Sequence, residues 1–233
     1  MKTFSIKLLL LLLIFNLTSC KKENSTSSLS EYKYADLTQT INCSTLDSKL
    51  LNEALYTFEN DIANFYDNKQ KNVIRAYNVF TRKAASNNKP VLQEFVSEHS
   101  VNVAKALNET GIFYNNGLNY NHDIIKCIGE NMSATGLETT FNALISTNSM
   151  SKELFQPALT GKASSMGKDK YLGLYVALEY FYSEVNKIDF SQMDFEKRDA
   201  ELAKKTKTTN PVKKIQSKSA TNPNVDFNKR PRK

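Results

Sequence analysis

The segment from Lys170 to Ile188 restricts the possible folds most, because it is apolar or aromatic on almost every side when drawn as a helix. A helix without a polar face has to be enclosed by other elements, as happens at the centre of a bundle. Glu179 and Glu184 interrupt the apolar run, which is also shorter than the roughly 20 residues that cross a bilayer core. The segment therefore predicts the central helix of a bundle and not a membrane span.

Apolar stripes at helical spacing predict the helices that would enclose this segment, at about 45–65, 70–85, 90–110 and 137–146. Shorter helices are expected at about 124–131 and 152–159, and a final charged helix at 194–205. Pro90 is expected in the first turn of the third helix and Gly111 at its C-cap. Because no segment of strand length alternates polar and apolar residues, the predicted fold class is all-α, a single bundle of about six to eight helices.

A short hairpin or irregular loop is expected between two of these helices, over residues 113–121. Its turn would be Asn116-Gly117, since both residues tolerate the positive φ angles of a tight turn. Tyr114 and Tyr120 flank the turn and are candidates for an exposed aromatic contact with a partner. The alternative is that both rings pack over the end of the bundle.

The first twenty residues predict a signal peptide, with Lys2 and Lys7 around the start of an apolar core. This segment ends in Leu17-Thr18-Ser19-Cys20, which resembles the lipobox of bacterial lipoproteins. The resemblance implies cleavage before Cys20, a diacylglycerol on its sulfur, and attachment of the protein to a membrane of the cell envelope. Because Lys21 follows the cysteine where an Asp commonly marks inner-membrane retention, the resemblance favours the outer membrane.

Charge is spread unevenly along the chain, whose formal net charge is +7. Residues 197–233 hold 12 basic and 3 acidic residues, a net of +9, whereas residues 20–196 hold 17 basic and 21 acidic residues, a net of −4. A nucleic-acid-binding domain would carry its positive charge on the folded face, so no nucleic-acid partner is expected. The predicted organisation is a signal peptide (1–19), a flexible lipidated tether (20–44), a helical domain (45–205) and a disordered basic tail (206–233).

The basic residues near the C-terminus are candidates for contact with an anionic surface, either anionic lipid or a cell-wall polymer. A tail that only keeps the protein soluble is the alternative. The candidates are Lys204, Lys205, Lys213, Lys214, Lys229, Arg230, Arg232 and Lys233.

Two cysteines remain besides Cys20. Cys43 and Cys127 form an even pair in a compartment that permits disulfides, which makes them a candidate bridge. The alternative leaves both unpaired, with Cys127 acting as a small buried hydrophobe in a helix.

No catalytic, cofactor-binding or metal-binding pattern is predicted. His99 and His122 are the only imidazoles, and neither lies in a His-Glu-x-x-His or Glu-x-x-His pattern. His99 is expected to be a satisfied, semi-buried residue, and His122-Asp123 a helix start. The glycines of segment 161–168 are separated by five residues, one more than a phosphate loop allows, so the segment is interpreted as a helix connection.

Four carboxylates of the first predicted helix remain to be placed: Glu53, Glu59, Asp61 and Asp67. Brought together by the fold, two of them would supply the acid and base of a hydrolase. They fall on the polar side of an amphipathic pattern, so a solvated face is the expectation.

The sequence leaves three hypotheses for function. The favoured one is a non-enzymatic, membrane-anchored helical module that binds another envelope component, whether protein, glycan or lipid. The second is an enzyme that acts on envelope polymers through carboxylates assembled by the fold. The third is a structural lipoprotein that binds the cell wall or a partner through its tail.

Overall fold

The computed structural model describes residues 29–44, 47–86 and 88–208. These residues are mostly helical, with one two-stranded sheet, which confirms the predicted all-α class. Contacts divide the chain into a unit that ends at Met193 and a second unit that begins at Asp194, and each is described by itself. Within the described ranges, no helix combines the length and the apolar content needed to cross a bilayer.

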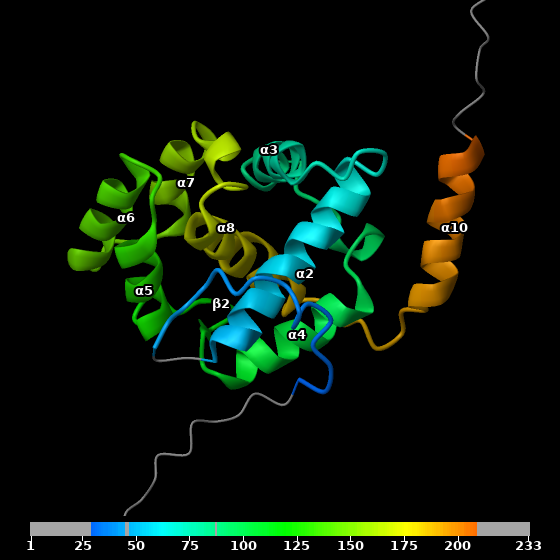
Figure 1. Cartoon of the computed structure of the whole chain (residues 1–233), viewed down its shortest axis with the longest axis horizontal. Coiled ribbons are helices and arrows are strands. Elements are labelled where there is room, and N and C mark those ends of the chain that lie inside the picture. Colours follow the sequence, from blue (N-terminus) through cyan, green and yellow to red (C-terminus); the bar gives the residue numbers. More distant parts are fainter. Residues whose placement is uncertain (1–28, 45–46, 87, 209–233) are drawn as a thin grey trace, which may run out of the picture. The chain divides into compact units, whose positions relative to one another are not determined.

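The helices of the first unit form a bundle (Figure 1). They are α2 (Ser48–Tyr66), α3 (Val73–Ala84), α4 (Glu98–Glu109), α5 (Asp123–Asn131), α6 (Leu137–Ser146), α7 (Lys152–Thr160), α8 (Lys170–Val176), η4 (Ala177–Tyr182) and α9 (Ser183–Val185). Two short 3-10 turns lie between them, η2 (Leu92–Glu94) and η3 (Ala163–Ser165). The second unit contains α10 (Phe195–Thr208).

The central helix is formed by α8, η4 and α9, which follow one another without a break. In Figure 1, α8 lies between α2 and α3 on one side and α5 to α7 on the other. Every residue from Leu172 to Ser183 is buried. The prediction that this segment is enclosed on all sides is confirmed.

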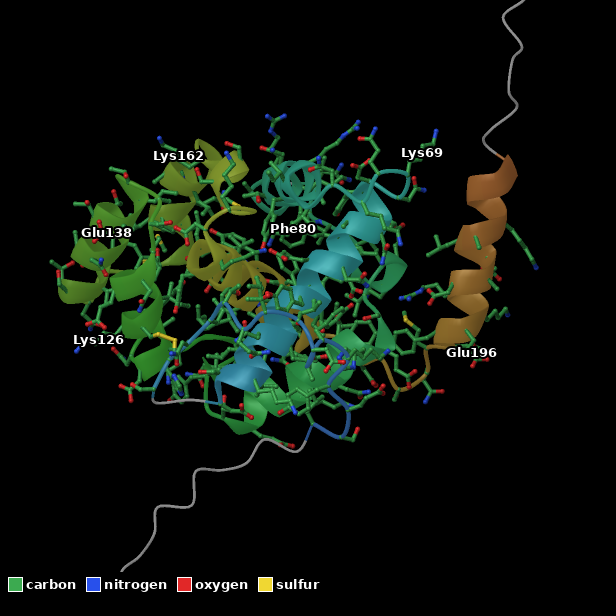
Figure 2. All side chains as sticks on the ribbon, viewed as in Figure 1. Lys69, Phe80, Lys126, Glu138, Lys162 and Glu196 are labelled. Carbon is green, nitrogen blue, oxygen red and sulfur yellow. A yellow bond between two sulfur atoms is a disulfide. The ribbon has the colours of Figure 1, made fainter. Side chains whose placement is uncertain are left out.

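Aromatic side chains fill the core around this helix. Phe181 packs against Phe58, with ring centroids 5.0 Å apart, and Phe58 packs edge-on against Phe80 at 5.1 Å. Figure 2 shows Phe80 between the helices, whereas Lys69, Lys126, Glu138 and Lys162 project from the surface. Offset and edge-to-face ring pairs of this kind contribute about 0.5–1.5 kcal/mol beyond their buried area.

Capping side chains define where the helices begin. Asp47 precedes α2, and its carboxylate accepts hydrogen bonds from the backbone N–H groups of Lys49 and Leu50, as the predicted start requires. The expectation that Pro90 lies in the first turn of α4 is wrong. The helix begins at Glu98 because Ser97 is a better N-cap, its hydroxyl accepting from the N–H of Ser100.

The hairpin forms, but its turn lies one residue earlier than expected. β1 (Phe113–Tyr114) pairs antiparallel with β2 (Gly117–Leu118), so the loop residues are Asn115 and Asn116. Their φ angles are 49° and 61°, which asparagine tolerates better than most residues. This register pairs Leu118 with Phe113 and places Leu118 in the core.

The described part of the expected tether, residues 29–44, packs on the bundle. Ile41 and Cys43 are buried, and the Asn52 side chain of α2 accepts hydrogen bonds from the N–H groups of Thr40 and Ile41. The folded body therefore begins before the boundary predicted at residue 44. The apolar residues of this segment are too few and too irregularly spaced to predict that it packs on the bundle.

A disulfide joins this N-terminal segment to α5. Cys43 and Cys127 are bonded, with Cα atoms 5.9 Å apart, and Figure 2 shows the bond in yellow. The bridge closes a sequence separation of 84 residues. It therefore connects two parts of the bundle that are distant along the chain.

Candidate functional site

The four carboxylates of α2 are buried, so the expectation of a solvated face is wrong. Glu53, Glu59, Asp61 and Asp67 are only 1%, 6%, 4% and 8% exposed. Burial of a carboxylate is costly unless donors surround it, and each of the four has its own donors. Neighbouring segments cover the polar side of this helix, which the spacing of apolar residues alone did not predict.

Glu53 joins the N-terminal segment to α4. Its two carboxylate oxygens accept hydrogen bonds from the N–H groups of Lys33, at 2.7 Å, and Tyr34, at 3.0 Å. The imidazole Nε2 of His99 lies 2.5 Å from the same carboxylate and is also buried. The interpretation of His99 as a satisfied residue in a helix is therefore consistent with its surroundings.

The other three carboxylates hold different segments. Asp61 accepts from the Ser100 hydroxyl at 2.7 Å, Glu59 from the Lys170 amine at 2.7 Å, and Asp67 from the N–H of Asn72 at 3.1 Å. Glu53 and Asp67 are separated by about 21 Å along the helix, at 1.5 Å per residue. Each of the four carboxylates is engaged by its own structural partners.

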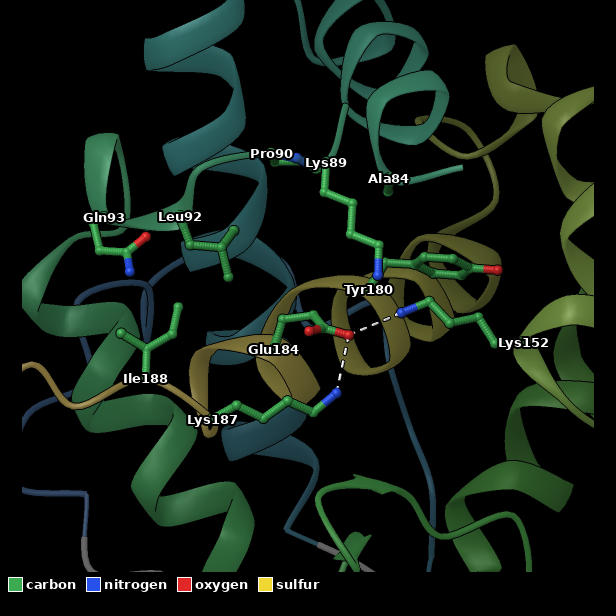
Figure 3. Close-up of a pocket in the computed structure, with 10 residues that line it drawn as sticks. All are labelled: Ala84, Lys89, Pro90, Leu92, Gln93, Lys152, Tyr180, Glu184, Lys187 and Ile188. Carbon is green, nitrogen blue, oxygen red and sulfur yellow. Dashed lines mark hydrogen bonds and ion pairs between the residues drawn. The ribbon is translucent and has the colours of Figure 1, made fainter. Parts of the chain in front are cut away.

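A pocket of about 140 Å³ lies where the end of α3, the loop before η2, the start of α7 and the central helix meet (Figure 3). We call it the lysine pocket. It is lined by Ala84, Lys89, Pro90, Leu92, Gln93, Lys152, Tyr180, Glu184, Lys187 and Ile188.

Glu184 organises two of the lysines in this pocket. Its Oε1 accepts hydrogen bonds from the Lys152 amine at 3.0 Å and the Lys187 amine at 3.1 Å. The Lys152 amine also lies over the ring of Tyr180, 4.7 Å from its centroid. Burial alone would raise the pKa of the Glu184 carboxyl, but the Lys152 and Lys187 amines outweigh it and hold the pKa below its usual value. The carboxylate therefore stays ionised and holds both amines in place.

Lys89 completes the polar side of the lysine pocket. Its side chain points into the pocket towards Tyr180, and it makes no ion pair with any described residue. Three amines against one carboxylate give the lining a formal charge of +2. Leu92 and Ile188 lie together on one side of the pocket, and Ala84 lies near Lys89 and Tyr180 (Figure 3).

Behind the lysine pocket lies a buried carboxyl, that of Glu179. The Tyr120 hydroxyl donates to its Oε2 at 3.0 Å. Burial raises the pKa of Glu179 to about 7, although the charges of Lys152 and Lys187 and the Tyr120 hydrogen bond act to lower it. Burial and the nearby carboxylate also raise the pKa of the Tyr120 hydroxyl. Glu179 can therefore change charge near neutral pH within electrostatic reach of the pocket lysines.

The π-helical segment η4 places the Glu179 carboxyl next to Tyr180, which lines the lysine pocket. A π turn inserts an extra residue into a helix, and such turns are common at functional sites. Here it contains both Glu179 and Tyr180, and the Ser183 hydroxyl donates to the backbone carbonyl of Glu179. The insertion changes which side chains face each side of the central helix.

The structure separates the two predicted aromatic candidates. Tyr114 is 69% exposed on the hairpin, whereas Tyr120 turns inward to Glu179. His122 caps α5 as predicted, since its Nδ1 accepts from the N–H of Ile124.

The remaining predicted site residues lie mostly outside the described part of the chain. Lys204 is exposed on α10, and the side chain of Lys205 is not among those described. Cys20 and the candidates Lys213, Lys214, Lys229, Arg230, Arg232 and Lys233 lie outside the described residues. The segment 161–168 connects α7 to α8 through η3.

Sequence reasoning missed the lysine pocket. Its lining extends from Ala84 to Ile188, and no motif links Lys89, Lys152 and Lys187, because the fold brings them together from separate elements. The only available signal was the pair of acidic residues, Glu179 and Glu184, in an otherwise apolar helix. Among the described residues, no three His, Cys, Asp or Glu side chains gather where they could hold a metal ion.

Comparison with known proteins gives no family for the chain: no protein-family model, no curated protein and no solved structure matches it. Function therefore has to be argued from the site itself.

Proposed function

We propose that this chain is a lipid-anchored envelope protein whose helical body binds an anionic ligand with a short apolar part. The observation that carries the proposal is the lysine pocket, whose lining holds three lysines, one carboxylate and the apolar side chains of Leu92 and Ile188. The sequence Leu17-Thr18-Ser19-Cys20 supports the anchor. The proposal is a binding function, because the buried carboxylates of α2 are already engaged by structural partners.

The lysine amines would make the pocket selective for anionic ligands. A lysine amine has three donors, and Lys152 and Lys187 each direct one of them to Glu184. The others are available to a carboxylate, sulfonate or phosphate group in the pocket. A hydrogen bond to a charged group contributes about 1.5–3 kcal/mol.

The apolar side chains of the pocket would bind the apolar part of the ligand. Leu92 is buried, Ile188 is half-buried, and the two side chains lie together on the side of the pocket near Lys187 (Figure 3). Each methylene that is removed from water there contributes about 0.8 kcal/mol. The volume is below the roughly 300–1,000 Å³ of sites for drug-sized ligands, so the pocket suits a short amphiphile or the end of a larger envelope molecule.

Calorimetric titration of hexanesulfonate tests the proposal. The protein would be residues 20–233 carrying Cys20→Ser, which removes the lipid. We expect saturable binding of hexanesulfonate and none of hexyltrimethylammonium, because the two probes share a chain length and differ in charge. Lys89→Gln is expected to weaken the binding about tenfold, the effect of one lost charge-assisted hydrogen bond.

Lys126→Gln is the matched control, because Lys126 lies on the surface of α5, 3.7 Å from Glu130, and does not line the pocket. It should leave the affinity unchanged. Equal binding of the anionic and cationic probes, or equal loss in the Lys89 and Lys126 variants, would contradict the proposal.

The anchor has its own test. In cells that make the full chain, Cys20 should take up labelled fatty acid and the protein should sediment with membranes. Cys20→Ala should abolish the label and release the protein into the soluble fraction. A Cys43→Ala variant that keeps the label would show that the lipid is specific to Cys20, and membrane retention of the Cys20→Ala protein would count against the anchor.

A further inference from the structure

A second hollow, of about 350 Å³, lies beside the hairpin, and we propose that it binds a neutral carbohydrate. We call it the hairpin hollow. It is lined by Asn108, Phe113, Tyr114, Asn115, Asn116, Ser183 and Asn186. Its residues come from the last turn of α4, from the hairpin and from the end of the central helix, and none of them lines the lysine pocket.

The chemistry of the lining selects an uncharged, hydroxyl-rich ligand. Every lining residue is neutral, so an ionic ligand would find no opposite charge there. Four of them are asparagines, and each amide offers two donors and an acceptor oxygen. Sugar hydroxyls both donate and accept, so amide groups match them in both directions.

Tyr114 provides the apolar part of the recognition. Its ring is 69% exposed, while most aromatic side chains of the described residues are buried or half-buried. One face of a pyranose ring presents C–H groups, which pack against an aromatic face in the way that other apolar groups do. A tyrosine ring also loses little conformational entropy on binding, since it has only two side-chain torsions.

The backbone holds the asparagines around the hollow. Asn115 and Asn116 occupy the two-residue turn at positive φ, directly after Tyr114. Asn186 also lines the hollow, and its Nδ2 is buried and makes no hydrogen bond to any described group. A buried donor without a partner is destabilising, so a side-chain rotation that brings this amide to a ligand hydroxyl would gain a hydrogen bond.

The proposal is tested by titrating the Cys20→Ser protein with a panel of uncharged sugars, observed by NMR. The panel consists of the methyl glycosides of glucose, galactose and mannose, and of N,N′-diacetylchitobiose. We expect at least one to bind in the millimolar range or tighter and to shift the side-chain amide signals of Asn108 or Asn186. Tyr114→Ala is expected to weaken that binding about tenfold through loss of the stacked ring.

Two further variants make the result decisive. Tyr114→Phe keeps the ring and should bind within about twofold of the parent, since stacking does not use the hydroxyl. Leu154→Ala removes an equally exposed apolar side chain on α7 and should change nothing. If no sugar of the panel binds, or if Tyr114→Ala and Leu154→Ala behave alike, the proposal is wrong. Failure here leaves the lysine pocket unaffected, because hexanesulfonate binding is measured separately.

Discussion

Glu53 is 1% exposed, and three polar groups lie against its carboxylate. The N–H groups of Lys33 and Tyr34 and the imidazole of His99 all come from segments other than α2. With its partners in place, the buried carboxylate stabilises the contact between these segments. Its removal destabilises the fold, because the partner groups stay buried without an acceptor.

Glu53→Ala is accordingly expected to lower the free energy of unfolding by about 3–5 kcal/mol. Urea unfolding followed by circular dichroism measures the change. The control is Glu98→Ala, which removes an exposed glutamate next to His99 and should cost about 0.5 kcal/mol or less. Similar losses in the two variants would show that Glu53 does not hold these segments together.

The ionised form of Glu179 destabilises the folded state, because burial raises the pKa of this carboxyl from the usual 4.5 to about 7. The folded state therefore holds a proton that the unfolded state releases between these two values. The stability that this carboxyl contributes is fully present below about pH 4.5 and is lost as the pH rises through about 7. At about 1.4 kcal/mol per pKa unit, the loss is about 3 kcal/mol.

Glu179→Gln should remove this pH dependence. The variant is expected to be about 3 kcal/mol more stable than the parent near pH 8 and about equal to it near pH 4, since glutamine stays neutral and can still accept from Tyr120. Urea unfolding at several pH values gives the curves. Glu153→Gln, an exposed position on α7, should keep the parent's pH dependence. A parent curve that is flat between about pH 5 and 8 would contradict the argument.

At the scale of elements, η4 connects this carboxyl to the lysine pocket. Tyr180 lines the pocket while Glu179, the residue before it, interacts with the charges of Lys152, Lys187 and Glu184. A charge on Glu179 therefore opposes an anion held by the same lysines. If the pocket binds an anion as proposed, protonation of Glu179 and anion binding should be coupled.

Hexanesulfonate should consequently bind more tightly as the pH falls through about 7. Protonation of Glu179 removes one negative charge near the pocket, and the sulfonate itself stays ionised throughout. The expected gain is about twofold or more, and it should be absent from Glu179→Gln. Calorimetry at several pH values measures it, and an unchanged pH profile in the variant would assign the effect to another group.

The disulfide acts between elements, because it joins the N-terminal segment to α5 across 84 residues of sequence. A crosslink over a loop of that length stabilises a protein by about 4.5 kcal/mol in the chain-entropy description. Reduction by dithiothreitol should therefore lower the free energy of unfolding by about this amount. The Cys43→Ser/Cys127→Ser protein should start at the lower value and show no response to the reductant. A response in that double variant would mean that the reductant acts elsewhere.

At the scale of the whole molecule, the proposed lipid anchor and the excess of basic residues lie near opposite ends of the sequence. Cys20 stands near one end of the sequence and the basic residues stand near the other, with a mildly acidic body of net −4 over residues 20–196 between them. An anionic membrane surface attracts basic residues by about 1 kcal/mol each within a Debye length. The proposed lipid on Cys20 and the basic tail would then both favour a membrane surface.

Removal of residues 209–233, which contain seven basic residues and one acidic residue, tests the contribution of the tail. In the Cys20→Ser background, this deletion leaves all of α10 and should reduce binding to phosphatidylglycerol vesicles at least about tenfold at low salt. Added salt should weaken the parent's binding, and vesicles of phosphatidylcholine should bind neither protein. Equal sedimentation of both proteins with anionic vesicles would exclude an electrostatic role for the tail.

The periodicity of the sequence was enough to predict the all-α class and the central helix, because the spacing of apolar residues is a local property that each segment carries by itself. Local chemistry also predicted the Asp47 cap and the helix start at His122. The shift of the hairpin turn by one residue shows the limit of such reasoning, since Asn115-Asn116 and Asn116-Gly117 both tolerate positive φ and local preferences do not decide between them.

Only the tertiary structure decided what surrounds each polar residue. The four buried carboxylates have the spacing of a solvated helix face: Glu53, Glu59, Asp61 and Asp67. They are buried because segments far away in the sequence cover them. The lysine pocket and the hairpin hollow arise in the same way, from side chains that lie up to about a hundred positions apart. Helical periodicity is determined within a few turns of chain, whereas a carboxylate's partners and a pocket's walls depend on how whole helices pack.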